Sequence, residues 1–278
     1  MDYNEISRWY NGYSFLNAKY IYNPRSVIEA LFSQNCSNYW AQTETYEALS
    51  IYLKTNHDGL KDIVVRLLAD ERKKIDIRSF TNDMVTFETY DDILTLLIHL
   101  GYLGYTSETK EVFIPNKEIS DEFVTAIKNA NWDEISVALK KSDDLLKATW
   151  RGDSDTVAKS IEQMHSETSI IKYNDENALS CVVSLAYYSA RQYYTIVREM
   201  PAGKGFADLV FLPRKKHLDK PAMIIELKWD KSADEAIQQI TNRQYYSDII
   251  KDYRGNTLLI GINYDKGVKN NECVIKMV

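Results

Sequence analysis

The feature that most constrains this sequence is a pair of short apolar segments, 206–213 and 223–229, which only charged residues interrupt. Asp208 stands alone in the first segment, and Glu226 and Lys228 stand in the second. A strand buried on both faces normally reads as a continuous apolar run. Burying an unpaired charge costs several kcal/mol. The two segments therefore predict neighbouring buried strands whose charges are gathered at one place.

Strand geometry indicates how these charges are arranged. Residues at positions i and i+2 point to the same face, so Glu226 and Lys228 emerge side by side. A purely structural Glu–Lys pair near a strand end is one interpretation of that motif. If the segments pair antiparallel through the 214–221 loop, Asp208 lies across from Glu226. Two carboxylates a few ångströms apart raise each other's pKa.

A divalent cation would relieve that repulsion. Carboxylate oxygens with remaining water ligands suit Mg²⁺ or Mn²⁺. Such an ion polarises a phosphate and lowers the pKa of a bound water. Lys228, on the same face, would orient or deprotonate that water and stabilise the developing charge. The expected reaction is hydrolysis of a phosphodiester.

The surrounding pattern predicts an α/β fold for the C-terminal part. A helix is expected over 175–192, followed by strands over 194–200, 206–213 and 223–229. Ser232 and Glu235 form a capping box that opens a second helix, to about residue 251. Strands over 257–264 and 272–278 complete the order αβββαββ, which predicts a mixed sheet.

An Asp, a spacer and Glu-x-Lys on adjacent strands, in this element order, resemble the PD-(D/E)XK nuclease superfamily. The blocks GKGFADLVFLP, IIELKW and AIQQITNRQYY resemble the bacterial branch in which the nuclease domain follows an AAA-ATPase-like domain. The resemblance implies a restriction-endonuclease-like αβββαβ core. It also implies that Asp208 and Glu226 bind the metal and that Lys228 assists the attacking water.

Two further residues enter by this resemblance. Glu176 would complete the metal site, although a carboxylate in the first helical turn is also favoured by the helix dipole alone. Gln239 would join Asp208, Glu226 and Lys228 in the catalytic set, although a solvated helix glutamine is common. The sequence departs from the family pattern at Ala207, where Pro is frequent, and at Phe206, where Arg is frequent. Neither departure removes a metal ligand.

The first 116 residues are expected to be mostly helical, with a winged-helix-like hairpin near their end. WYNGYSF, IYNPRSV and LGYLGY resemble the C-terminal end of the same AAA-ATPase-like domain, so the chain is expected to be a shortened form of such proteins. No phosphate-binding GxxxxGK[ST] motif occurs, so no ATP hydrolysis is predicted. The predicted division is a helical domain at 1–116, a helical connector at 117–169 and the nuclease-like domain at 170–278.

Composition limits the partners. The net charge of −6 argues against broad nucleic-acid binding but allows a local basic surface. Candidate nucleic-acid contacts are Lys204 in a glycine turn and Arg214, Lys215 and Lys216 in the strand connection, where a solvated loop is the alternative. Three separated cysteines and the absence of a long apolar run or signal sequence predict a cytoplasmic protein without a membrane span.

The sequence thus predicts a Mg²⁺- or Mn²⁺-dependent nuclease that acts on nucleic acid, with DNA the expected substrate and endonucleolytic cleavage the expected mode. Two alternatives stay open. One is a non-catalytic module that keeps the nuclease fold to bind nucleic acid or protein. The other is a regulatory fragment whose helical half binds a separate ATPase subunit. A homo-oligomer is also left open.

Overall fold

A computed structural model describes residues 1–15, 18–40, 46–55, 59–78, 80, 87, 89–130, 132–167, 175–202, 205–242, 253 and 255–278. The chain divides into two compact units, Met1–Ser136 and Val137–Val278. Each unit has its own buried apolar core. The three-part division predicted from the sequence stays a prediction.

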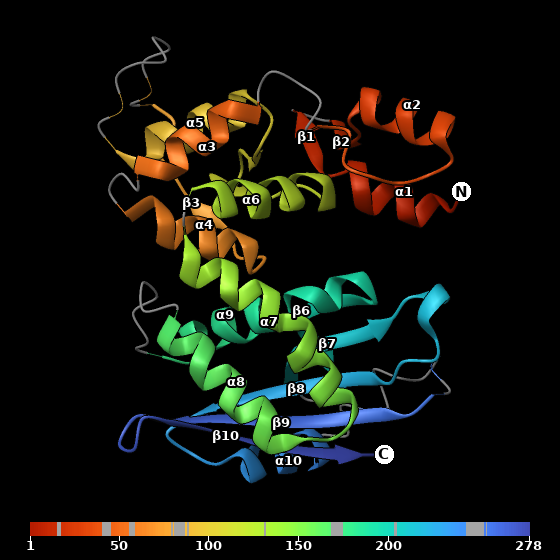
Figure 1. Ribbon diagram of the computed structural model, residues 1–278, viewed down its shortest axis with the longest axis vertical. Helices are drawn as coiled ribbons and strands as arrows, with labels where there is room; N and C mark the ends of the chain where they lie inside the picture. The colour runs from red at the N-terminus through yellow and green to blue at the C-terminus, as the bar shows by residue number, and fades with distance from the viewer. Residues whose placement is uncertain are drawn as a thin grey trace. The chain divides into compact units, whose positions relative to one another are not determined.

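The N-terminal unit is mainly helical, as expected (Figure 1). Its elements are α1 Tyr3–Tyr10, β1 Tyr13–Phe15, β2 Ala18–Ile21, α2 Pro24–Ser33, α3 Tyr46–Thr55, α4 Leu60–Leu68, β3 Lys73–Lys74, α5 Tyr90–His99, β4 Gly104–Thr106, β5 Glu111–Phe113 and α6 Lys117–Asn129.

At the start of α2, Asn23 caps the helix by accepting a hydrogen bond from the Ser26 backbone N–H. The predicted hairpin after α5 is present as β4 and β5, and β3 adds a third strand beside β5.

The C-terminal unit is built around one five-stranded sheet. Its elements, counted from a helix that begins just before the unit, are α7 Asp133–Trp150, α8 Ser154–Glu167, α9 Glu176–Ala186, η3 Tyr188–Gln192, β6 Tyr194–Ala202, β7 Gly205–Pro213, η4 Lys215–His217, β8 Ala222–Trp229, α10 Ala233–Asn242, β9 Thr257–Asp265 and β10 Asn270–Met277.

The strand order in this sheet is β10-β9-β8-β7-β6. All pairs are antiparallel except β8 with β9, which run parallel because α10 crosses over between them. This is the mixed sheet that the sequence predicted.

Helices flank both faces of the sheet. In Figure 1, α10 lies on one side of the strands, and α8 and α9 lie on the other. Ile237 and Ile240 of α10 pack with Ile224 of β8 and Leu259 of β9 in one buried cluster. Tyr187, which caps α9, packs its ring against Phe211, 5.4 Å away between centroids. Two-sided burial explains why all of β8 except its last residue is buried.

The helix predicted over 175–192 is shorter than expected. The α-helix ends at Ala186, and residues Tyr188–Gln192 form a 3-10 helix. Tyr187 is fully buried, with its hydroxyl in a hydrogen bond to Thr149 of α7. Burying this aromatic ring with its hydroxyl partnered is compatible with a change of helical geometry at this residue.

Candidate active site

The candidate site forms where β7 and β8 separate. Three residue pairs join the two strands, ending with Leu209 opposite Ile225. Continuing that register by one residue places Asp208 opposite Glu226. Beyond this point β8 stays paired with β9 up to Trp229, whereas no further pair joins it to β7. The separation leaves a gap in the backbone ladder between β7 and β8, beside Asp208 and Glu226.

Asp208 bridges this gap. Its Oδ2 accepts a hydrogen bond of 2.7 Å from the backbone N–H of Leu227. The bond satisfies an amide group that would otherwise face the departing strand. The half-buried carboxylate is thereby fixed between the two strands, beside Glu226 and Lys228.

Glu226 and Lys228 are both buried, with 2% and 7% of their surface exposed. Lys228 Nζ lies 3.1 Å from Glu226 Oε1 and 3.0 Å from the Leu227 carbonyl oxygen. The ion pair offsets part of the desolvation cost of each charge. The predicted side-by-side placement of these residues is therefore what the structure shows.

Gln239, from the second turn of α10, reaches the same carboxylate. Its Nε2 donates a hydrogen bond to Glu226 Oε1, the oxygen that Lys228 also contacts. Two donors on one oxygen hold Glu226 in a single orientation. Gln239 is the predicted residue that connects α10 to the charges of β8.

The pKa of Asp208 is raised, and its causes identify the charged groups near the carboxylate. Burial is the main cause that raises its pKa, and the Leu227 N–H opposes that effect. Glu176 and Glu199 each raise the pKa further, and Lys228 lowers it. Glu176 is exposed at the first position of α9, so the predicted third carboxylate lies close enough to act on Asp208.

Glu199 was not predicted from the sequence. Strands β6 and β7 pair from Tyr194 opposite Pro213 to Ala202 opposite Gly205, and the same register sets Glu199 opposite Asp208. The strands expected over 194–200 and 206–213 stop short of the observed ones, so the register of Glu199 was not predicted.

The predicted nucleic-acid contacts are not brought to this site. Arg214, Lys215 and Lys216 follow the far end of β7, six residues beyond Asp208, which is roughly 20 Å along a strand. Lys215 and Lys216 are exposed, and Arg214 is half-buried. Lys204 lies outside the described residues.

The donor set fits a hard divalent cation. Within the described residues, no group of three or more His, Cys, Asp or Glu side chains is placed to hold a metal ion. Magnesium, however, is commonly bound through one or two carboxylates together with water and substrate phosphate. Asp208 and Glu226 supply two such carboxylates, with Glu176 nearby.

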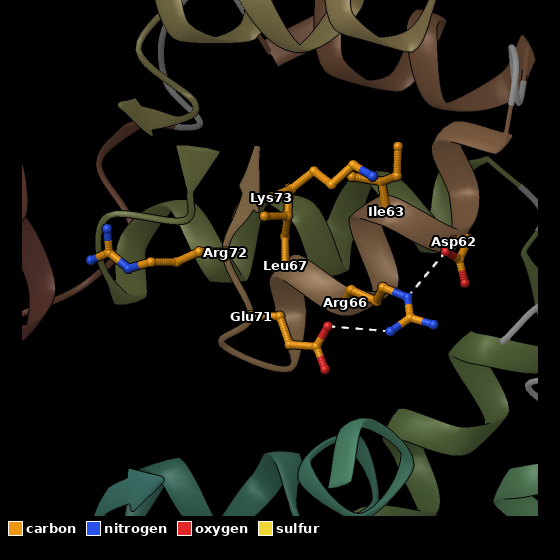
Figure 2. A pocket seen from close by; sticks show the side chains of 7 residues that line it. All are labelled: Asp62, Ile63, Arg66, Leu67, Glu71, Arg72 and Lys73. Carbon is orange, nitrogen blue, oxygen red and sulfur yellow. Dashed lines mark hydrogen bonds and ion pairs between the residues drawn. The ribbon is translucent and has the colours of Figure 1, made fainter. Parts of the chain in front are cut away.

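The N-terminal unit contains a separate pocket of about 260 Å³ (Figure 2). Arg66 bridges two carboxylates there, 3.1 Å from Asp62 and 3.3 Å from Glu71. Arg72 lies over the ring of Phe113, 4.2 Å from its centroid. None of the predicted catalytic or metal-binding residues lines this pocket, so the charges on β7 and β8 remain the best candidate site.

Comparison with known families supports the same region. Residues 154–274 match the family model of the PD-(D/E)XK nuclease superfamily. The match spans α8 to β10 and includes every candidate catalytic residue. No curated protein matches the chain. The resemblance of residues 1–116 to an AAA-ATPase-like domain stays a prediction.

Proposed function

We propose that this protein is a divalent-metal-dependent nuclease that hydrolyses phosphodiester bonds, with DNA as the expected substrate, since residues 154–274 match the family model of the PD-(D/E)XK nuclease superfamily. The observation that carries the proposal is the convergence of Asp208, Glu226 and Lys228 where β7 and β8 separate. A family match alone gives the fold, whereas this convergence supplies the groups that the chemistry needs.

Asp208 and Glu226 would hold Mg²⁺ or Mn²⁺, with Glu176 as a further ligand. When bound, the ion supplies Lewis-acid activation of the phosphate and of a water. Asp208 is kept in place by the Leu227 amide, and Glu226 by Lys228 and Gln239. This preorganisation spares the site a reorganisation during the reaction.

Lys228 has a second role in the proposal. Its side chain is buried and its Nζ lies 3.1 Å from Glu226, so the ammonium group would lie close to the reacting phosphate. Such a charge stabilises the negative charge that develops on the phosphate oxygens. It also positions the attacking water by donating a hydrogen bond.

A plasmid-nicking assay with Mg²⁺ or Mn²⁺ tests this function. We expect Asp208→Asn, Glu226→Gln and Lys228→Met each to lower the rate by about a hundredfold or more. Asp219→Asn and Lys276→Met are controls of matched chemistry, because both residues are exposed, Asp219 in the connection before β8 and Lys276 on the edge strand β10. Circular dichroism checks that each variant is folded.

Calorimetric titration of Mn²⁺ separates the enzyme from a binding module. Wild type should bind the ion, and Asp208→Asn should bind it at least tenfold more weakly. If wild type and all three site variants are equally inert on DNA and RNA, and Mn²⁺ binding is unchanged by Asp208→Asn, the hydrolytic function is wrong. A protein that keeps the nuclease fold only for binding would give that result.

A further inference from the structure

Phe206 is an exposed aromatic residue beside the candidate site. It lies on β7 two positions before Asp208, with 59% of its surface exposed. The burial pattern alternates here, because Phe206 and Asp208 are the more accessible residues and Ala207 and Leu209 are buried. Residues at i and i+2 of a strand share a face, so the ring and the carboxylate lie on the same side of β7.

The spacing of these two groups suits a nucleotide. A strand rises about 3.3 Å per residue, so the Cα atoms of Phe206 and Asp208 are roughly 7 Å apart. A nucleotide bridges such a span from its base to its phosphate. Within the described residues, no ring contact involves Phe206, so its exposed face is open to a planar group.

We propose that Phe206 stacks on a nucleobase next to the phosphodiester that is hydrolysed, and that the substrate is therefore unpaired nucleic acid. This inference rests on the proposed nuclease function and names its substrate class. An unpaired base offers an open π-face to an aromatic side chain, whereas both faces of a base inside a duplex are covered by its neighbours.

The distribution of charge favours the same substrate. Duplex binding depends strongly on neutralising phosphates with lysine and arginine. The net charge of the protein is −6, and the described basic run Arg214–Lys216 lies at the opposite end of β7. The near surroundings of Asp208 include the carboxylates of Glu176 and Glu199. Base stacking would supply affinity that does not depend on basic side chains.

Binding measurements without a divalent ion test the inference in the absence of hydrolysis. The probes are a single-stranded oligonucleotide that contains the fluorescent base 2-aminopurine and the corresponding duplex, both at one fixed salt concentration. Phe206→Ala is compared with Phe206→Trp, which keeps a stacking surface. Phe32→Ala is the matched control, because Phe32 is another exposed phenylalanine, in the N-terminal unit.

We expect Phe206→Ala to weaken single-strand binding about tenfold and to leave duplex binding within about twofold. Phe206→Trp should restore binding and the quenching of 2-aminopurine, and Phe32→Ala should behave as wild type. Equal single-strand affinity for Phe206→Ala and wild type would overturn the inference. So would an equal loss on single strand and duplex, because that result indicates a general structural effect.

Cleavage of the same two probes with Mn²⁺ separates this inference from the proposed function. If wild type cleaves and Phe206→Ala cleaves the single strand equally well, the hydrolytic function stands and the stacking role is wrong. If wild type binds the single strand through Phe206 but cleaves neither probe, the stacking role stands and hydrolysis is wrong.

Discussion

At the scale of single residues, the site depends on which atoms hold each charge. Asp208 is fixed by a backbone amide, and Glu226 is fixed by an ammonium group and an amide side chain. The two carboxylates are therefore held by different donors. These hydrogen bonds offset part of the cost of placing both carboxylates in a mostly apolar sheet.

Glu199 has an unusual backbone conformation. Its φ of 48° lies in the left-handed region, which costs a non-glycine residue about 1 kcal/mol or more. We predict that Glu199→Gly stabilises the metal-free protein, because relief of the backbone strain contributes about 1 kcal/mol. The larger conformational entropy that glycine loses on folding reduces this gain. Urea unfolding measures the change. Glu199→Ala is the control, since it removes the same carboxylate but keeps a β-carbon, and equal stability of the two variants would contradict the prediction.

Glu118 is a buried carboxyl group in the N-terminal unit whose ionisation affects stability. Its side chain is fully buried on α6 and accepts hydrogen bonds from the backbone N–H groups of Tyr39 and Trp40. Burial raises the pKa of Glu118 above its ordinary value of 4.5. The folded state therefore holds the proton more tightly than the unfolded state, so stability falls as pH rises from about 4.5 through the raised pKa.

Glu118→Gln should remove this loss while keeping an oxygen that accepts both amide bonds. We expect the variant to become more stable relative to wild type as pH rises from 4.5 to 7, so its free energy of unfolding should increase relative to that of wild type. Urea unfolding across that range measures the difference. Glu29→Gln, at an exposed position on α2, should show no such trend; a parallel pH profile for Glu118→Gln and wild type would contradict the prediction.

At the scale of elements, the position of α10 decides whether Gln239 reaches Glu226. The helix packs on β9 at Gly261, which lies beside Glu226 in the parallel register. A β-carbon at position 261 would lie 2.2 Å from the carbonyl oxygen of Ala233 and 3.0 Å from the side chain of Ala236. Glycine therefore permits the close approach of the helix.

We predict that Gly261→Ala destabilises the protein by about 1–3 kcal/mol, because the helix must move away from the strand. The proposed nuclease activity should fall as well, because the same movement separates Gln239 from Glu226. Thermal unfolding and the nicking assay measure the two effects. Gly267→Ala is the control, since there the nearest atom belongs to the side chain of Asp265 in an exposed turn; equal effects of both substitutions would count against this explanation.

The sequence predicted the elements of the C-terminal unit well, for identifiable reasons. The apolar runs of β7 and β8 mark strands by composition, and their isolated charges mark the site. The sequence could not show that β7 and β8 separate after Leu209 and Ile225, because register and divergence depend on tertiary pairing. For the same reason it missed Glu199, which the β6–β7 register sets opposite Asp208.

At the scale of the whole molecule, the two compact units differ in kind. The N-terminal unit is helical, and the C-terminal unit carries the sheet, the family match and the candidate site. No helix among the described residues is long and apolar enough to cross a membrane. Because the proposed metal ligands all belong to one unit, an ion that binds there should stabilise that unit specifically.

Calorimetry of the intact chain measures this stabilisation. A ligand that binds only the folded state adds about 2.7 kcal/mol of stability at a hundred times its dissociation constant. For a unit of this size, Mn²⁺ at that concentration should raise the melting temperature of the C-terminal unit by roughly 5 °C or more.

The same ion should leave the melting temperature of Asp208→Asn nearly unchanged, since the variant lacks one of the two carboxylates that face the gap between β7 and β8. Glu118→Gln, which alters only the N-terminal unit, should keep the full shift. An equal shift in wild type and Asp208→Asn would mean that the ion binds elsewhere, and the gap between the strands would then lose its proposed role.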